Sequence, residues 1–139
     1  MKVAWFSCGA TSAVACKLGL QKYPDLEICY IETGSHHPDN MRFLHDCEKW
    51  FGKKITILRS AYKDIFDVFE RTGFIHSAHY APCTQKLKTL VRQQYEYEHD
   101  IDIYIYGVLK RVLKRKIERK GCASDTPNTS TNFRLLKIT

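Results

Sequence analysis

Short apolar segments alternate with helical segments through most of the chain, and this alternation limits the fold more than any other feature. Four segments have the apolar, β-branched composition of strands: residues 2–7, 27–32, 54–59 and 101–106. Apolar positions with helical spacing lie between them, in residues 11–20, 38–51, 63–71 and 84–98. Strands separated by helices of this length join through right-handed crossovers into a parallel sheet. We therefore expect a three-layer α/β domain with helices on both faces of the sheet.

Glycine and proline residues mark several of the expected boundaries. Pro38 stands where a first helical residue would be, and Gly52 and Gly73 each follow the last residue of a helical segment.

In open parallel sheets, ligands bind beyond the carboxyl ends of the strands. We expect the informative loops to be those after the first, second and fourth strands, together with the loop 76–86.

The length and composition are typical of one globular domain. The chain has 139 residues, of which 44% are hydrophobic. Its six cysteines are scattered without a CxxC pair, which favours reduced thiols in a cytoplasmic protein over a disulfide framework. No segment approaches the roughly 18 apolar residues of a membrane span, and the start of the chain lacks a secretion signal. We expect a cytoplasmic protein without a membrane partner; the sequence does not indicate its oligomeric state.

Most of the net charge of +7 comes from one short segment. Residues 109–120 contain seven basic residues and one acidic residue, so the preceding part of the chain is nearly neutral. A local basic segment does not by itself make a domain a nucleic-acid binder. A solvated charged helix is the preferred interpretation, and nucleic-acid binding through this segment is the alternative.

The loop that joins the first strand to the first helix is suited to phosphate. It consists of Ser7, Cys8, Gly9, Ala10, Thr11 and Ser12. Backbone amides at a helix start have no intrahelical partner, and the helix dipole favours an anion there. Gly9 and Ala10 permit close approach of the backbone, and the serine and threonine side chains add hydroxyls. An ordinary capped turn is the alternative, because the loop matches neither a Walker loop nor a GxGxxG fingerprint.

Two further segments offer weaker candidates. Thr33 and Gly34 follow the second strand at the same edge of the expected sheet, where they could contact the base or ribose of a nucleotide. Lys86 and Lys88 lie near the start of the fourth helix, where an anion would offset their unfavourable interaction with the helix dipole. A simple helix-entry turn and two solvated lysines are the alternatives.

Histidines and a cysteine in the loop before the fourth helix have a spacing compatible with a metal. His76, His79 and Cys83 form this set, and His36 and His37 could add a ligand. Without a CxxC pair this pattern is not specific, so we expect no metal site.

Together, these motifs carry a resemblance to a known family. The Ser-x-Gly-x-x-Ser loop, the ETGSHHPDNMRFLHDCEKWFG stretch and the APCTQKLK stretch resemble the phosphoadenosine phosphosulfate (PAPS) reductase family, in its compact phage and bacterial branch. That family lies within the PP-loop ATP pyrophosphatase superfamily of adenine nucleotide alpha-hydrolase-like folds. The resemblance covers residues 1 to about 107.

The resemblance implies a five-stranded parallel sheet with an adenine nucleotide, ATP or PAPS, over its carboxyl edge. Phosphate would lie against Ser7, Gly9 and Ser12, and the nucleoside near Thr33 and Gly34. The resemblance also implies phosphate contacts from Lys86 and Lys88. By position, the full nucleotide-binding set is Ser7, Cys8, Gly9, Ala10, Thr11, Ser12, Thr33, Gly34, Cys83, Lys86 and Lys88.

The sequence departs from the family pattern at chemically important positions. Cys8 replaces a glycine, which predicts a wider turn, and Thr11 replaces an aspartate that could help to handle Mg²⁺. The Glu-Cys-Gly motif that carries the reductase nucleophile is missing, and only Cys83 remains where related enzymes bind an iron–sulfur cluster. We therefore expect no cluster and assign no catalytic residue.

The character of the sequence changes after Gly107. Residues 108–139 read as a basic, partly disordered tail, and the fold as truncated after its fourth strand. When the frame of residues 122–137 is moved by two nucleotides, codon degeneracy permits RLRYPKHKYEFPLIEN, which resembles the continuation expected of the family. This suggests the hypothesis that residues from about 108 onward are a frameshift product.

The sequence thus predicts an adenine-nucleotide-binding, PAPS reductase-like protein whose partner is a small-molecule nucleotide. It would act on a nucleotide sulfate, or adenylate a substrate with release of pyrophosphate and the help of Mg²⁺. The alternative is a non-catalytic nucleotide-binding or nucleic-acid-associated accessory protein.

Overall fold

A computed structural model describes residues 1–107 of the chain. The elements follow one another as β1 (Lys2–Phe6), α1 (Ala10–Lys22), β2 (Glu27–Glu32), α2 (Asp39–Phe51), β3 (Thr56–Arg59), α3 (Ile65–Thr72), α4 (Pro82–Thr84), η1 (Gln85–Thr89), α5 (Leu90–Glu98) and β4 (Ile103–Tyr106). The predictions for the tail after Gly107, namely its basic helix, its disorder and its frameshift origin, lie outside these residues.

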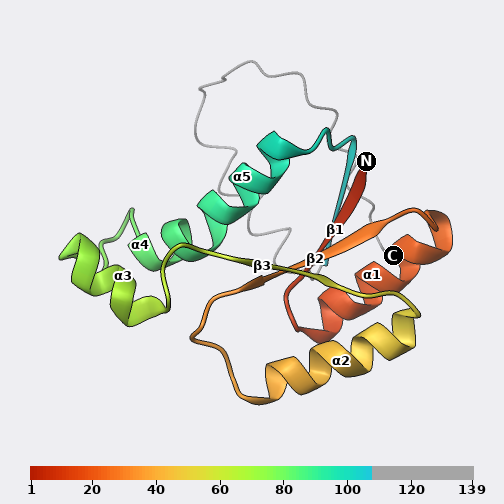
Figure 1. Cartoon of the computed structure of the whole chain (residues 1–139), viewed down its shortest axis with the longest axis horizontal. Helices are drawn as coiled ribbons and strands as arrows, with labels where there is room; N and C mark the ends of the chain where they lie inside the picture. Colours follow the sequence, from red (N-terminus) through yellow and green to blue (C-terminus); the bar gives the residue numbers. More distant parts are fainter. Residues whose placement is uncertain (108–139) are drawn as a thin grey trace.

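The four strands form one parallel sheet in the order β3-β2-β1-β4. The described residues thus contain four of the five strands that the resemblance implies. All strands run in the same direction, so the loops after β1, β2 and β3 gather at one edge with α3 and α4 (Figure 1). This is the carboxyl edge, where parallel sheets bind ligands.

Helices cover both faces of the sheet, which confirms the predicted α/β architecture. On one face, α1 and α2 bury Cys16, Leu44 and Phe51 against Phe6 and Ile28. On the other face, Tyr95 of α5 packs against side chains of β1 and β2, and its ring meets that of Trp5 edge-on at 5.9 Å. Among residues 1–107, no helix has both the length and the apolar character needed to cross a bilayer.

The element bounds agree with those predicted from the sequence to within two residues. β2 has the predicted bounds, and Gly52 and Gly73 end α2 and α3 in the left-handed conformation. Pro38 precedes the first residue of α2 rather than occupying it. The helix expected over residues 84–98 begins at Pro82 and contains a π turn at Gln85–Thr89, in which Leu90 N donates to Gln85 O.

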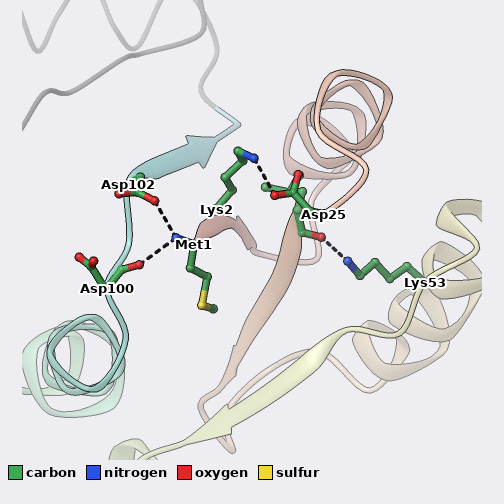
Figure 2. Close-up of polar contacts among 7 residues, drawn as sticks. Met1, Lys2, Asp25, Lys53, Asp100 and Asp102 are labelled. Carbon is green, nitrogen blue, oxygen red and sulfur yellow. Dashed lines mark hydrogen bonds and ion pairs between the residues drawn. The ribbon is translucent and has the colours of Figure 1, made fainter.

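Charged contacts tie the chain together at the opposite, amino edge of the sheet (Figure 2). The Met1 ammonium donates to Asp100 O at 2.9 Å and to Asp102 Oδ2 at 2.7 Å, and this hydrogen bond lowers the pKa of the Asp102 carboxyl. Lys2 pairs with Asp25 at 2.6 Å. These contacts join the starts of β1, β2 and β4, at the edge opposite the carboxyl ends of the strands.

Candidate functional site

Ser12 organises the loop between β1 and α1. Its side chain is buried, and its Oγ accepts hydrogen bonds from Ser7 N at 3.2 Å, Gly9 N at 3.3 Å and Ser7 Oγ at 3.1 Å. The same hydroxyl donates to Gly9 O at 2.8 Å. The Ser12 side chain therefore holds the loop in a fixed shape from within.

The first turn of α1 presents backbone donors beyond this loop. Gly9 is the N-cap residue, and the first helical hydrogen bond runs from Ala13 N to Gly9 O. The amides of Ala10, Thr11 and Ser12 precede that bond and have no acceptor within the helix. Ala10 is exposed, so this end of the helix is open to an anion.

Cys8 adopts the conformation that would suit a glycine. Its φ is +54°, so the loop accommodates the Cβ in the left-handed region, whereas the sequence suggested a wider turn. The thiol donates to Asn40 O at 3.6 Å. Burial raises the pKa of Cys8 to about 11, and a hydrogen bond with the Tyr30 phenol offsets part of this rise. Cys8 therefore joins the loop to α2 as a protonated thiol.

Gly107 lies against the start of α1, a contact that sequence reasoning missed. A Cβ on Gly107 would lie 2.5 Å from Ser12 Cα, 2.6 Å from Thr11 O and 2.7 Å from Ser12 N. Only a residue without a side chain permits this approach. The end of β4 thus supports the loop Ser7–Ser12 at the start of α1.

Thr33 and Gly34 lie at the end of β2, next to the loop that follows β1. Gly34 has φ +71° and donates its amide to Glu32 Oε1 at 2.9 Å. A Cβ on Gly34 would lie 2.1 Å from Lys63 O, so this turn is packed against the loop that follows β3. Thr33 is half-buried and Gly34 exposed, which leaves the turn accessible to a ligand.

The structure connects Lys86 to the loop after β3. Ser60 Oγ donates to Lys86 O at 2.9 Å and accepts from Tyr62 N at 3.2 Å. The side chain of Lys86 is half-buried and that of Lys88 exposed, and neither ammonium has a hydrogen-bond or ion-pair partner among residues 1–107. Cys83 is half-buried in the first turn of this helix. The π turn beside it is a feature that often occurs at functional sites.

A cavity of about 560 Å³ lies at the carboxyl ends of β2 and β3. Gly34 lines it, and so do Arg59, the last residue of β3, and Lys63, in the loop that follows. The sequence indicated informative loops after the first, second and fourth strands, and the loop after β3 was not among them. The signal that could have found it was the pair of basic residues, Arg59 and Lys63, on either side of a short polar loop.

The candidate metal ligands do not converge. His76 and His79 are exposed in the loop before α4, and within the described part of the chain no three side chains of His, Cys, Asp or Glu form a group that could hold a metal ion.

Burial raises the pKa of Cys16 to about 12 and that of Cys29 to about 11. Like Cys8, these two residues serve packing and are not thiolates at neutral pH.

Ser12 is the first target for mutation of this loop. In Ser12→Ala, the amides of Ser7 and Gly9 lose their buried acceptor, so we expect the free energy of unfolding to fall by about 2 kcal/mol. Chemical denaturation followed by circular dichroism would measure it. Thr11→Ala is the matched control, because no side-chain hydrogen bond of Thr11 contributes to the loop; an equal loss in both variants would contradict the role of Ser12.

A comparison with protein families identifies the family of this chain. Residues 2–125 match the family described as the phosphoadenosine phosphosulfate reductase domain. The match includes the loop after β1, the turn after β2 and the start of α4, and it extends beyond Gly107. No curated protein matches the chain significantly.

Proposed function

We propose that the chain binds an adenine nucleotide across the carboxyl ends of β1 and β2. The chain belongs to the phosphoadenosine phosphosulfate reductase domain family, and it is a PAPS reductase-like nucleotide-binding protein. The phosphate, or the sulfate-bearing phosphate of PAPS, lies against the loop Ser7–Ser12. The nucleoside lies over Thr33 and Gly34.

The observation that carries this proposal is the arrangement around Ser12. Its hydroxyl uses the Ser7 and Gly9 amides to shape the loop, which leaves the first-turn amides of α1 to meet the ligand. Preorganised donors at a helix N-terminus bind an anion without having to reorganise. Gly107 fixes the same turn from the other side.

Lys86 and Lys88 supply the positive charge in this proposal. Neither ammonium is paired within residues 1–107, and the Ser60 hydrogen bond fixes the backbone at Lys86. A lysine side chain is long and flexible, so it follows a phosphate as a mobile point charge. Cys83 precedes both lysines in the same helix and belongs to the proposed binding surface.

Two activities are compatible with such a site: a reaction on a nucleotide sulfate, and adenylation of a substrate with release of pyrophosphate. The residues do not fit a protein-held Mg²⁺ ion, since the loop Ser7–Ser12 contains no carboxylate and no metal-binding group occurs among residues 1–107. Of the two, we propose the nucleotide sulfate as the substrate class, because amides, hydroxyls and lysines suffice to bind it.

The protonated thiols favour a second candidate, nucleotide binding without turnover. Cys8, Cys16 and Cys29 all have a raised pKa, so none of them is a ready nucleophile. In this alternative, the site senses or stores a nucleotide as part of an accessory protein.

A thermal-shift panel tests the binding proposal. A nucleotide at about a hundred times its Kd stabilises a protein by about 2.7 kcal/mol, so PAPS, ATP or AMP should raise Tm by several degrees while adenosine should not. The double variant Lys86→Gln/Lys88→Gln should lose most of the shift. Lys49→Gln, an exposed change in the last turn of α2, is the control.

The outcomes separate the candidates. No shift with any nucleotide would overturn the proposal. Turnover assays then follow binding: sulfite release from PAPS with a thiol reductant supports the reductase-like activity, and pyrophosphate release from ATP with Mg²⁺ supports adenylation. Binding without either product supports the accessory role.

A further inference from the structure

The cavity at the ends of β2 and β3 is walled by segments that hold one another in place. Gly34 packs directly against the backbone of Lys63, and Ile65 N donates to Ser35 Oγ at 3.0 Å. The hydroxyl of Ser60, another residue that lines the cavity, donates a hydrogen bond to the backbone carbonyl of Lys86. The cavity of about 560 Å³ is therefore formed before any ligand arrives, at a size typical of small-molecule sites.

Both carboxylates that line the cavity have hydrogen-bond or ion-pair partners within the protein. Glu32 Oε1 accepts from Gly34 N at 2.9 Å and lies against His36 Nδ1. Asp67 uses one oxygen for Arg71 Nε at 2.8 Å and the other for Lys63 N at 2.9 Å. Asp67 thus has both oxygens engaged, while the contacts of Glu32 toward Gly34 and His36 both run through Oε1.

The cations divide into one that is paired and two that are not. Arg71 is paired with Asp67 and stacks over the Tyr62 ring, with its guanidinium carbon 5.2 Å from the ring centroid. The side chains of Arg59 and Lys63 have no ion pair or hydrogen bond with any residue of the described range 1–107. Arg59 is the register partner of Glu32, yet Glu32 turns to Gly34 and His36 instead.

We propose that Arg59 and Lys63 form an anion-binding subsite in the cavity at the ends of β2 and β3, separate from the phosphate-binding loop after β1. The ligand group is a phosphate, sulfate or carboxylate. Arg59 offers a planar fork of donors and Lys63 a point charge, a combination suited to an oxyanion. The adjacent Gly34 turn joins this subsite to the proposed nucleoside position, so the inference rests in part on the proposed function.

The anion has two sources that an experiment can separate. It is either a second phosphate on the bound nucleotide or the acidic group of a separate small molecule. Adenosine 3′,5′-bisphosphate and AMP differ by one phosphate and test the first source. Sulfate, titrated into the free protein and into the AMP-saturated protein at constant ionic strength, tests the second.

Calorimetric titrations of Arg59→Gln, Lys63→Gln and the double variant provide the measurement. Both side chains are exposed, so the fold should tolerate these changes, and the Tm of each variant checks this. Lys49→Gln removes an equal charge outside the cavity and is the matched control. Each single change is expected to weaken binding by about tenfold, as for the loss of one charge-assisted hydrogen bond.

A loss confined to the bisphosphate, with unchanged AMP affinity, supports the nucleotide as the source. A loss of sulfate binding with unchanged nucleotide affinities supports a separate acidic ligand. If all variants bind both the bisphosphate and sulfate within about twofold of the control, the subsite is overturned. If the wild-type protein does not bind AMP, the proposed function fails, and the sulfate titration of the free protein still decides the subsite.

Discussion

Replacing Gly34 by alanine is expected to lower the free energy of unfolding by about 3 kcal/mol and to remove measurable nucleotide binding. The left-handed backbone at φ +71° alone costs about 1 kcal/mol for a residue with a Cβ. The new Cβ would also lie 2.1 Å from Lys63 O, and a backbone carbonyl cannot swing away as a side chain would. Relief of this clash must separate the β2 turn from the loop after β3. Denaturant unfolding and a nucleotide titration measure the two effects.

Two other glycines of the chain provide the control. Gly52 and Gly73 have φ +69° and +62°, and a Cβ on either would meet nothing within 4 Å. In Gly52→Ala and Gly73→Ala, the free energy of unfolding should therefore fall only by the cost of the left-handed backbone, about 1 kcal/mol each. Both variants should keep the nucleotide affinity of the wild type. If Gly34→Ala is as stable as Gly52→Ala and Gly73→Ala, the contact with Lys63 does not constrain the turn.

The layers of the fold could be predicted because they depend on local patterns. The apolar run Glu27–Glu32 and the helical spacing up to Phe51 specify one strand and one helix, whatever their neighbours are. Gly52 and Gly73 were correct stop signals, because a left-handed residue ends a helix by local geometry. The boundaries that differ are starts, as in β3 and β4, and also ends, as in α1, because tertiary contacts decide where each element begins and stops.

The site was less predictable because its contacts join segments far apart in sequence. The Ser7–Ser12 loop was found from its composition, but no local pattern shows that Ser12 would be buried at its centre. The cavity depends on Gly34 meeting Lys63 and on the pairing of β2 with β3. The π turn at Gln85–Thr89 was missed for a related reason: one shifted hydrogen bond leaves the apolar spacing of the helix nearly unchanged.

The two glycine contacts define the site from opposite sides. Gly34 joins the turn after β2 to the wall of the cavity, while Gly107 supports the start of α1, where the proposed phosphate would bind. From the sequence, Gly107 was recognised only as the last residue of the family resemblance. Its position against Ser12 gives it a structural role that its neighbours in sequence do not suggest.

Gly107→Ala is expected to lower the free energy of unfolding by about 2–3 kcal/mol and nucleotide affinity by at least about tenfold. Its Cβ would lie within 2.7 Å of three backbone atoms of Thr11 and Ser12, so the end of β4 and the start of α1 must move apart. That movement displaces the first-turn amides that the proposed phosphate contacts. Thermal unfolding and calorimetric titration with AMP measure the two losses on the same sample.

Gly9→Ala is the matched control for this prediction. A Cβ on Gly9 would lie 3.8 Å from Ser7 Oγ and 3.9 Å from Ser12 Oγ, which is ordinary van der Waals contact. We expect it to change stability by less than about 1 kcal/mol, and to weaken AMP binding only if the phosphate lies directly over Gly9. The stability measurement therefore separates support of the loop by Gly107 from the proposed contact of Gly9 with the ligand. Wild-type stability and affinity in Gly107→Ala would contradict the close approach of β4 to α1.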